Sequence, residues 1–313
     1  MQRKDNKVII RGFKNYYCDA VYSSLGEFIK PEDYDLSTLT KEQLEILSQY
    51  AVIKNIMAGV NEVYLKVPTP GVGISALEKY GLKGKEIVPA EEMNNVKTSS
   101  LVRERLVLEI GSLLEYNQNF LSDVSDFAGI TDCGLLIKLG QDLEEVGKVV
   151  NKYKFSPTET LESFGFLDRK CYVYGLNFID KDDQKILKEY DAMCIFSPLE
   201  DGENGLGAIN LYNFIYNELK FGFSTGKCYN IDMLLQGKLA KLNTSNLMYQ
   251  NDLIDSELLI ESLQSEEGEI EIELDDFERG ENIFDKKVFI QREEYQKLRE
   301  KVKDIARGLK EKE

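Results

Sequence analysis

The chain has 313 residues, of which 42% are hydrophobic, so it is long and apolar enough to bury a sizeable core. Its 55 acidic residues outnumber 39 basic ones, and the formal net charge of −16 argues against nucleic acid and anionic membranes as partners. The sequence contains no histidine, the side chain most used to bind zinc and to transfer protons near neutral pH. It also shows no signal peptide and no membrane-length apolar run, so we expect a soluble cytoplasmic protein.

Short apolar stretches alternate with amphipathic ones along most of the chain. Strands are expected at residues 7–10, 60–67, 86–88, 106–110, 134–139, 171–176, 192–196 and 220–224. Helices are expected at residues 41–58, 75–80, 118–127, 143–153, 183–190 and 209–218. Thr40 with Gln43, and Ser156 with Glu159, are capping-box pairs that predict where two helices begin. Repeated strand–helix units predict an α/β fold, a (β/α)8 TIM-type barrel with its site at the carboxyl ends of the strands.

The composition changes near residue 264, which divides the chain into a barrel, residues 1–264, and an appendage, residues 265–313. Residues 266–278 are strongly acidic, but apolar residues alternate with the acidic ones, as in an edge strand with one solvated face. Residues 288–290 could pair with this strand. Apolar residues then recur every three or four positions from Tyr295 to Leu309, which predicts an amphipathic C-terminal helix packed on its own domain.

The cysteines lack the spacing of a disulfide framework or a zinc site. They are Cys18, Cys133, Cys171, Cys194 and Cys228. Cys18 and Cys228 lie near the ends of neighbouring expected strands, which leaves a thiolate site as an alternative. Cys18, however, should point away from the barrel if Tyr17 and Asp19 point into it. The glycine-rich segment 202–207 lacks the lysine of a phosphate loop and has acidic neighbours, so we expect a flexible loop there.

Several segments resemble the amidohydrolase superfamily, specifically its metal-dependent deaminases and chlorohydrolases and, within these, an aminohydrolase subgroup. Residues 7–24, KVIIRGFKNYYCDAVYSS, resemble the first barrel strand, which in the family carries an Asn-Thr-His-x-His motif. Residues 156–180 resemble the fifth helix and sixth strand, and residues 135–141 resemble the fifth strand. The resemblance covers most of residues 7–310 and implies the same barrel.

The positions that this family uses to bind its metal and to transfer protons hold other residues in this chain. The resemblance places these degenerate positions at Tyr17, Asp19, Lys138, Gln141, Gly175, Phe178, Phe196 and Gly226. The family's chemistry needs a divalent metal that activates water and a carboxylate that carries the proton. Because this set cannot supply either, we expect no metal, no cofactor and no metal-dependent hydrolysis.

Two kinds of function remain open. In the first, the chain is a pseudoenzyme that serves as a binding, scaffold or regulatory subunit, as a homodimer or in a complex with another protein. In the second, it is a metal-independent enzyme or small-ligand-binding protein with a remodelled barrel-mouth site around Lys138, Asp19 and Tyr17. Lys138 is either a reactive or ligand-binding lysine, or a replacement for the metal charge that pairs with Asp19. A mouth plugged by Tyr17, Phe178 and Phe196 would favour the first function.

Overall fold

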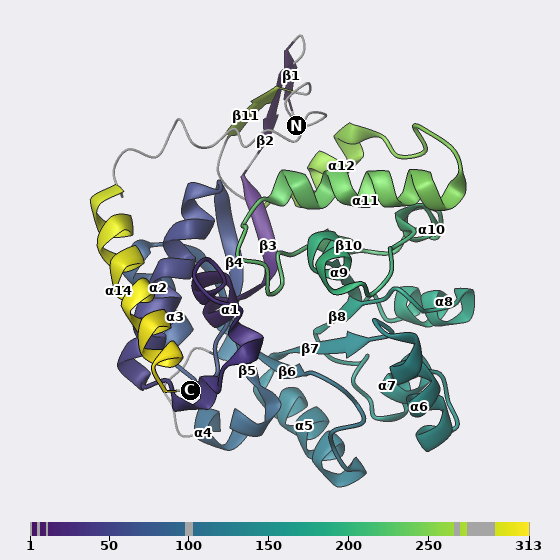
Figure 1. Ribbon diagram of the computed structural model, residues 1–313. Coiled ribbons are helices and arrows are strands. Elements are labelled where there is room, and N and C mark those ends of the chain that lie inside the picture. Colours follow the sequence, from purple (N-terminus) through teal and green to yellow (C-terminus); the bar gives the residue numbers. More distant parts are fainter. Residues whose placement is uncertain are drawn as a thin grey trace.

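The computed structural model describes residues 2–4, 7–10, 12–97, 103–265, 270–273 and 292–312. Within these ranges an eight-stranded parallel sheet runs in the order β10-β9-β8-β7-β6-β5-β4-β3 (Figure 1). The sheet closes where the amide of Asp19 donates to the carbonyl of Gly226 and that of Gly226 to the carbonyl of Tyr17, both at 2.9 Å. The predicted (β/α)8 barrel is confirmed. Its strands are β3 (Phe13–Asp19), β4 (Val60–Lys66), β5 (Lys83–Pro89), β6 (Leu106–Ile110), β7 (Gly134–Leu139), β8 (Cys171–Gly175), β9 (Met193–Phe196) and β10 (Phe221–Phe223).

Helices surround the barrel and connect its strands (Figure 1). They include α1 (Ala20–Leu25), α2 (Lys41–Met57), α3 (Val72–Tyr80), α4 (Met93–Lys97), α5 (Gln118–Thr131), α6 (Leu143–Tyr153), α7 (Pro157–Ser163), α8 (Lys181–Glu189), α9 (Pro198–Asn204), α10 (Leu211–Tyr216), α11 (Met233–Met248) and α12 (Ser256–Leu263). Both predicted capping boxes form, at the starts of α2 and α7. The prediction of a flexible loop at 202–207 is wrong for residues 202–204, because these belong to α9. The helix is capped by Gly205, whose φ is +65°.

The strand at Lys7–Ile10 exists, but it is not part of the barrel. As β2 it pairs antiparallel with β1 (Gln2–Lys4) and with β11 (Ile270–Glu273), so a small three-stranded sheet joins segments from both sides of the expected boundary at residue 264. The acidic edge strand is therefore confirmed over Ile270–Glu273. The pairing expected at residues 288–290 lies outside the described residues. The first barrel strand is β3, which contains the family-like positions Tyr17 and Asp19.

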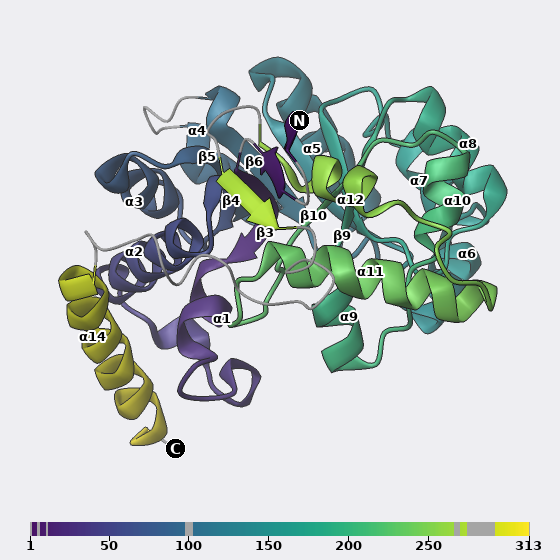
Figure 2. The ribbon, with the colours of Figure 1, turned by 90° about the horizontal axis from the view of Figure 1, so that it is seen from above.

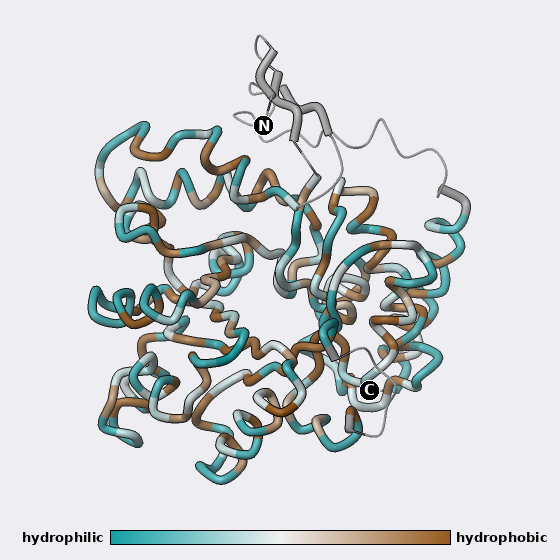
Figure 3. Tube along the Cα trace, turned by 180° about the vertical axis from the view of Figure 1, so that it is seen from behind, coloured by the Kyte–Doolittle hydropathy of each residue, from teal (hydrophilic) through white to brown (hydrophobic). Residues whose placement is uncertain are grey.

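Two apolar clusters stabilise the barrel. The larger fills the space between the strands and the surrounding helices, and the smaller takes inward-facing residues from seven strands and fills the barrel itself. The smaller cluster is formed by Tyr16, Tyr17, Tyr64, Ile87, Val107, Leu136, Tyr174 and Ile195, with Tyr172 and Met193 packed against it. Hydrophilic stretches lie largely toward the periphery in Figure 3. The barrel is thus a packed core rather than an open channel, as the fold requires.

The C-terminal helix α14 (Arg292–Lys310) forms as the apolar spacing predicts, and it lies along the outer side of α2 (Figure 2). Val302 and Leu298 are buried, and the ring of Tyr295 stacks on that of Tyr50 with centroids 5.2 Å apart. The guanidinium of Arg299 donates from Nε to Glu27 at 2.7 Å. The helix therefore packs on its own domain. None of the helices in the described ranges combines the length and apolar character needed to cross a membrane.

Candidate functional site

A bulge in β3 turns two consecutive tyrosines into the barrel. The pairing of β3 with β4 shifts register between Asn15 and Cys18. Asn15 faces outward, where its Nδ2 donates to Asn55 and to Thr225, and Cys18 faces outward, where its sulfur contacts Ser23. The two residues between them, Tyr16 and Tyr17, both belong to the interior cluster. The expected outward direction of Cys18 is confirmed, and burial raises the pKa of its thiol, which opposes a thiolate site.

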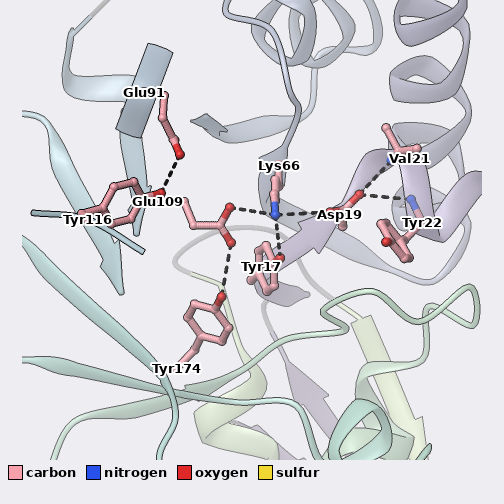
Figure 4. A network of polar contacts seen from close by, with 9 residues as sticks. All are labelled: Tyr17, Asp19, Val21, Tyr22, Lys66, Glu91, Glu109, Tyr116 and Tyr174. Atoms are coloured by element: carbon pink, nitrogen blue, oxygen red, sulfur yellow. Dashed lines mark hydrogen bonds and ion pairs between the residues drawn. The ribbon is translucent and has the colours of Figure 1, made fainter. Parts of the chain in front are cut away.

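The ammonium group of Lys66, the last residue of β4, lies at the carboxyl end of the barrel (Figure 4). Its Nζ is 2.7 Å from Oε2 of Glu109 and 3.6 Å from Oδ2 of Asp19. It is also 3.5 Å from the hydroxyl of Tyr17. The two carboxylate side chains are only 6% exposed, and the lysine side chain is 21% exposed. One partly exposed cation is thus shared by two buried carboxylates.

The remaining oxygens of this cluster also have partners. Asp19 caps α1, with Oδ1 accepting from the amides of Val21 at 3.0 Å and Tyr22 at 3.1 Å. Tyr174 donates to Oε1 of Glu109 at 3.3 Å. Burial raises the pKa of Tyr174 and of Tyr17, and Glu109 raises both further, so these phenols stay protonated. Burial opposes the charge of Lys66, but Glu109 and Asp19 outweigh it, and the pKa of Lys66 lies above its ordinary value.

The predicted pairing of Lys138 with Asp19 is wrong. Lys138 Nζ lies 3.0 Å from Oε2 of Glu145, on α6, whereas Asp19 pairs with Lys66. The reason is the strand register, since Asp19 and Lys66 are direct neighbours across β3 and β4. The lysine that pairs with Asp19 therefore comes from the second barrel strand instead of the fifth.

Side chains from neighbouring segments lie against two glycines, Gly226 and Gly175, at which the resemblance predicts metal ligands. A Cβ at Gly226 would lie 1.7 Å from Oε2 of Glu200, and Gly226 has a φ of +55°. A Cβ at Gly175 would lie 2.6 Å from Cβ of Gln141, and Gly175 has a φ of +96°. Neither position can accept a side chain unless its neighbour moves. Glu200 and Gln141 now occupy the space that side chains at these positions would need.

Glu200 and Asp201 bring two buried carboxyl groups from α9 to the barrel mouth. Burial raises the pKa of Glu200 to about 7, an effect that Lys227 opposes and Asp201 reinforces. Burial also raises the pKa of Asp201 to about 6, although Gln141 donates to it at 3.0 Å. Oε2 of Glu200 is buried without a hydrogen-bond partner among the described residues. A protonated, neutral Glu200 costs less free energy to bury than a charged one, which is why burial favours the protonated form near neutral pH.

Phe178 and Phe196 do not plug the barrel mouth, so the arrangement that would favour the first function is not formed by these two residues. Phe196 faces the helix layer, where its ring packs edge-on against Phe214 of α10 with centroids 4.9 Å apart. Phe178 is 39% exposed, on the segment after β8. The aromatic residues that close the mouth are Tyr17 and Tyr174, whose ring centroids are 5.3 Å apart. Of the three residues named for a plugged mouth, only Tyr17 lies in the barrel interior.

The residues at the barrel mouth do not fit a divalent metal. One oxygen of Asp19 caps a helix and the other faces an ammonium, so neither is available as a ligand. Lys66 occupies the space between Asp19 and Glu109 with a positive charge of its own. No group of three or more histidine, cysteine or acidic residues in the described part of the chain is arranged to hold a metal ion.

Most of this cluster was not predicted from the sequence. The residues not predicted are Lys66, Glu109, Tyr174, Glu200 and Asp201. A signal was present for the first two, because a charged residue in the last two positions of a barrel strand points to the site at the carboxyl face. Glu200 and Asp201 gave no such signal, since they precede glycines in a segment that was expected to be a loop.

No protein-family model and no curated protein matches this chain. Solved structures match its fold: an amidohydrolase from Brucella melitensis aligns with a TM-score of 0.73 and 11% identity, over 96% of this chain and 90% of that one. A guanine deaminase from C. acetobutylicum with guanine in its active site has a TM-score of 0.70 and 11% identity, over 96% and 83%. An adenosine deaminase from Xanthomonas campestris with bound zinc has a TM-score of 0.71 and 12% identity, over 82% and 66%. The structural neighbours of this barrel are thus amidohydrolase-superfamily deaminases and hydrolases.

Proposed function

We propose that this chain is a pseudoenzyme of the deaminase-like barrel fold, and that it acts as a binding, scaffold or regulatory subunit. The observation that carries the proposal is the Lys66 ammonium held between Asp19 and Glu109 at the carboxyl end of the barrel. Hydrolysis in such barrels needs an activated water and a group that carries the proton. Here the cation is an ammonium that cannot bind water as a metal does, and the amide of Gln141 cannot take up a proton.

The proposal predicts that the purified protein carries no catalytic metal and does not deaminate the substrates of its structural neighbours. Elemental analysis is expected to find well under one equivalent of zinc, iron or manganese per chain. Incubation with guanine or adenosine is expected to release no ammonia above the level of heat-denatured protein. Stoichiometric metal that is lost in Asp19→Ala, or ammonia release that is lost in that variant, would contradict the proposal.

A second candidate is a metal-independent enzyme or small-ligand-binding protein that uses the same mouth. The observation that favours it is Glu200, a buried carboxyl with a pKa of about 7 and one oxygen without a partner among the described residues. Such a group is suited to accept a proton or to bind an amide or amino group of a ligand. Thermal-shift measurements with nucleobases on the wild-type protein and Glu200→Gln separate the candidates, because only the second gives a stabilisation that depends on Glu200.

Association with a second copy of the chain is the mode of action that we propose for the scaffold. Large apolar side chains are exposed on α10 and along the second half of α11, among them Tyr216, Leu242, Leu247, Met248 and Tyr249. Tyr216 is 74% exposed and Tyr249 is 96% exposed. Soluble proteins rarely leave such a group of side chains uncovered. A stable contact needs roughly 1,000 Å² of buried surface, which neighbouring faces of two helices can contribute to.

The association proposal predicts a dimer in light scattering at micromolar concentration. The double variant Leu247→Lys with Tyr249→Glu is expected to be monomeric, because it places charges in the buried centre of the contact. Ile130→Lys is the matched control, since Ile130 is 81% exposed but lies on α5, away from α11. A wild-type protein that stays monomeric at these concentrations would overturn the self-association proposal.

A further inference from the structure

A pocket lies outside the barrel, on the flank that α14 covers. Its volume is about 280 Å³, and it is bounded by α2, the segment after α1, the segment between β10 and α11, and α14. Lys54 and Met57 contribute from α2, Tyr229 and Ile231 from the segment after β10, and Tyr295 from α14. Nothing in the proposed function of the barrel mouth uses this pocket. Its size is at the lower end for small-molecule sites, which suits a ligand with a single ring.

Lys54 places an ammonium group in the wall of this pocket. Its Nζ donates to the carbonyl of Ser23 at 2.7 Å and to the carbonyl of Tyr229 at short range. The rings of Tyr50 and Tyr229 lie 5.7 Å and 6.0 Å from it. Burial lowers the pKa of Lys54 to about 8, so the group is still mainly charged at pH 7. Two of its three N–H groups have carbonyl acceptors.

Glu27, the acidic residue in the described part of the pocket wall, already has a partner for each of its carboxylate oxygens. Oε1 of Glu27 accepts from Nε of Arg299 at 2.7 Å, and Oε2 accepts from the hydroxyl of Tyr50 at 2.6 Å. The Glu27–Arg299 ion pair carries no net charge, so Lys54 gives the described wall a net charge of +1, although Glu27 is near enough to raise the pKa of Lys54 against the effect of burial. This is unusual on a chain whose formal net charge is −16. The electrostatic preference of the pocket is for a ligand with a single negative charge.

Apart from the amide side chain of Asn230, the other residues of the described pocket wall are apolar or aromatic. Tyr295 is stacked on Tyr50, which fixes one aromatic face, and Met57 and Ile231 supply aliphatic surface. Tyr229 is 51% exposed, so its ring can be covered further by a bound molecule. Aromatic and aliphatic walls around one fixed charge favour a flat apolar ligand with one polar end.

We propose that this pocket binds a small aromatic monocarboxylate, whose carboxylate accepts from Lys54 and whose ring packs among Tyr229, Tyr295 and Met57. The charge-assisted hydrogen bond from Lys54 selects for an anionic ligand, and the aromatic side chains select for a ligand with a planar ring. Because Tyr295 belongs to α14, the ligand also ties the C-terminal helix to the barrel.

The probes that test the proposal are benzoate, its neutral analogue benzamide and its cationic analogue benzylamine. Binding is measured by changes in amide resonances and by titration calorimetry at millimolar ligand. Benzoate is expected to bind about tenfold more tightly than benzamide, the ratio that one charged hydrogen bond supplies, and benzylamine is expected not to bind. Raising the pH from 7 to 9.5 should lower the affinity for benzoate about tenfold, because Lys54 loses its charge whereas benzoate keeps its own.

Variants distinguish a ligand-binding role of Lys54 from a purely structural role, in which it only bonds the carbonyl groups of Ser23 and Tyr229. Lys54→Met is expected to lose the preference for benzoate over benzamide, whereas Lys148→Met, an exposed lysine on α6, should keep it. If Lys54→Met does not fold, Tyr229→Ala is the alternative, because it keeps the lysine and both of its carbonyl acceptors. This variant removes the ring and is expected to lower the affinities for benzoate and benzamide by the same factor. Equal binding of benzoate and benzamide, a benzoate affinity that is independent of pH, or no binding of any probe at millimolar concentration would overturn the proposal.

Discussion

Lys66→Met is expected to lower the free energy of unfolding by about 3 kcal/mol, which would be the largest effect of any single lysine substitution at the barrel mouth. The variant leaves the carboxylates of Asp19 and Glu109 buried and facing each other without their shared cation. The measurement is urea denaturation at pH 7. Lys138→Met is the matched control, because Lys138 has one acidic partner and is 27% exposed, and its loss should cost about 1 kcal/mol or less.

The triple variant Lys66→Met, Asp19→Asn, Glu109→Gln is expected to recover most of the lost stability, because it removes both unpaired charges with the ammonium. If the lysine stands in for a metal, added Mg²⁺ or Mn²⁺ should raise the Tm of Lys66→Met and leave the triple variant unchanged. The interpretation fails if Lys66→Met costs no more than Lys138→Met, or if the triple variant is less stable than the single one.

Glu200→Gln is expected to stabilise the protein at pH 8 by about 2 kcal/mol and to have little effect near pH 4. The pKa of Glu200 is raised to about 7 in the folded protein, so the folded state holds a proton that the unfolded state has released. The contribution of the protonated carboxyl to stability is complete below the unfolded pKa and is lost as the pH rises through 7. The full shift corresponds to about 3 kcal/mol at 1.36 kcal/mol per pKa unit.

The measurement is the free energy of unfolding of the wild-type protein and of Glu200→Gln between pH 4 and pH 9. The two curves should separate progressively as the pH rises and should run parallel above pH 8. Asp201 adds a change of the same sign, since its pKa is raised to about 6, but Asp201 remains in both proteins and cancels in the comparison. Glu144→Gln, an exposed change on α6, is the control and should give no pH-dependent difference. Parallel curves over the whole range would contradict the buried, protonated state of Glu200.

The barrel itself could be predicted from the sequence, because strand and helix formation depends on neighbours in the chain. Apolar stretches of five to seven residues between amphipathic ones mark the strands β4, β6 and β7. Helix starts were equally local: Thr40 and Ser156 lie three residues before the side chains that complete their capping boxes. Composition alone also revealed the absence of histidine, a common metal ligand in proteins.

Only the tertiary structure decided which charged groups meet at the barrel mouth. The partner of Asp19 depends on the register between β3 and β4, which sets Lys66 beside it, and a bulge in β3 turns both Tyr16 and Tyr17 inward. Glu200 meets Gly226 because α9 folds back over the end of β10, a contact between residues 26 positions apart in the chain. Register, bulges and helix placement are determined by packing across the whole barrel. No local pattern carries them, and that is why the scaffold could be predicted from the sequence while the charged cluster at its mouth could not.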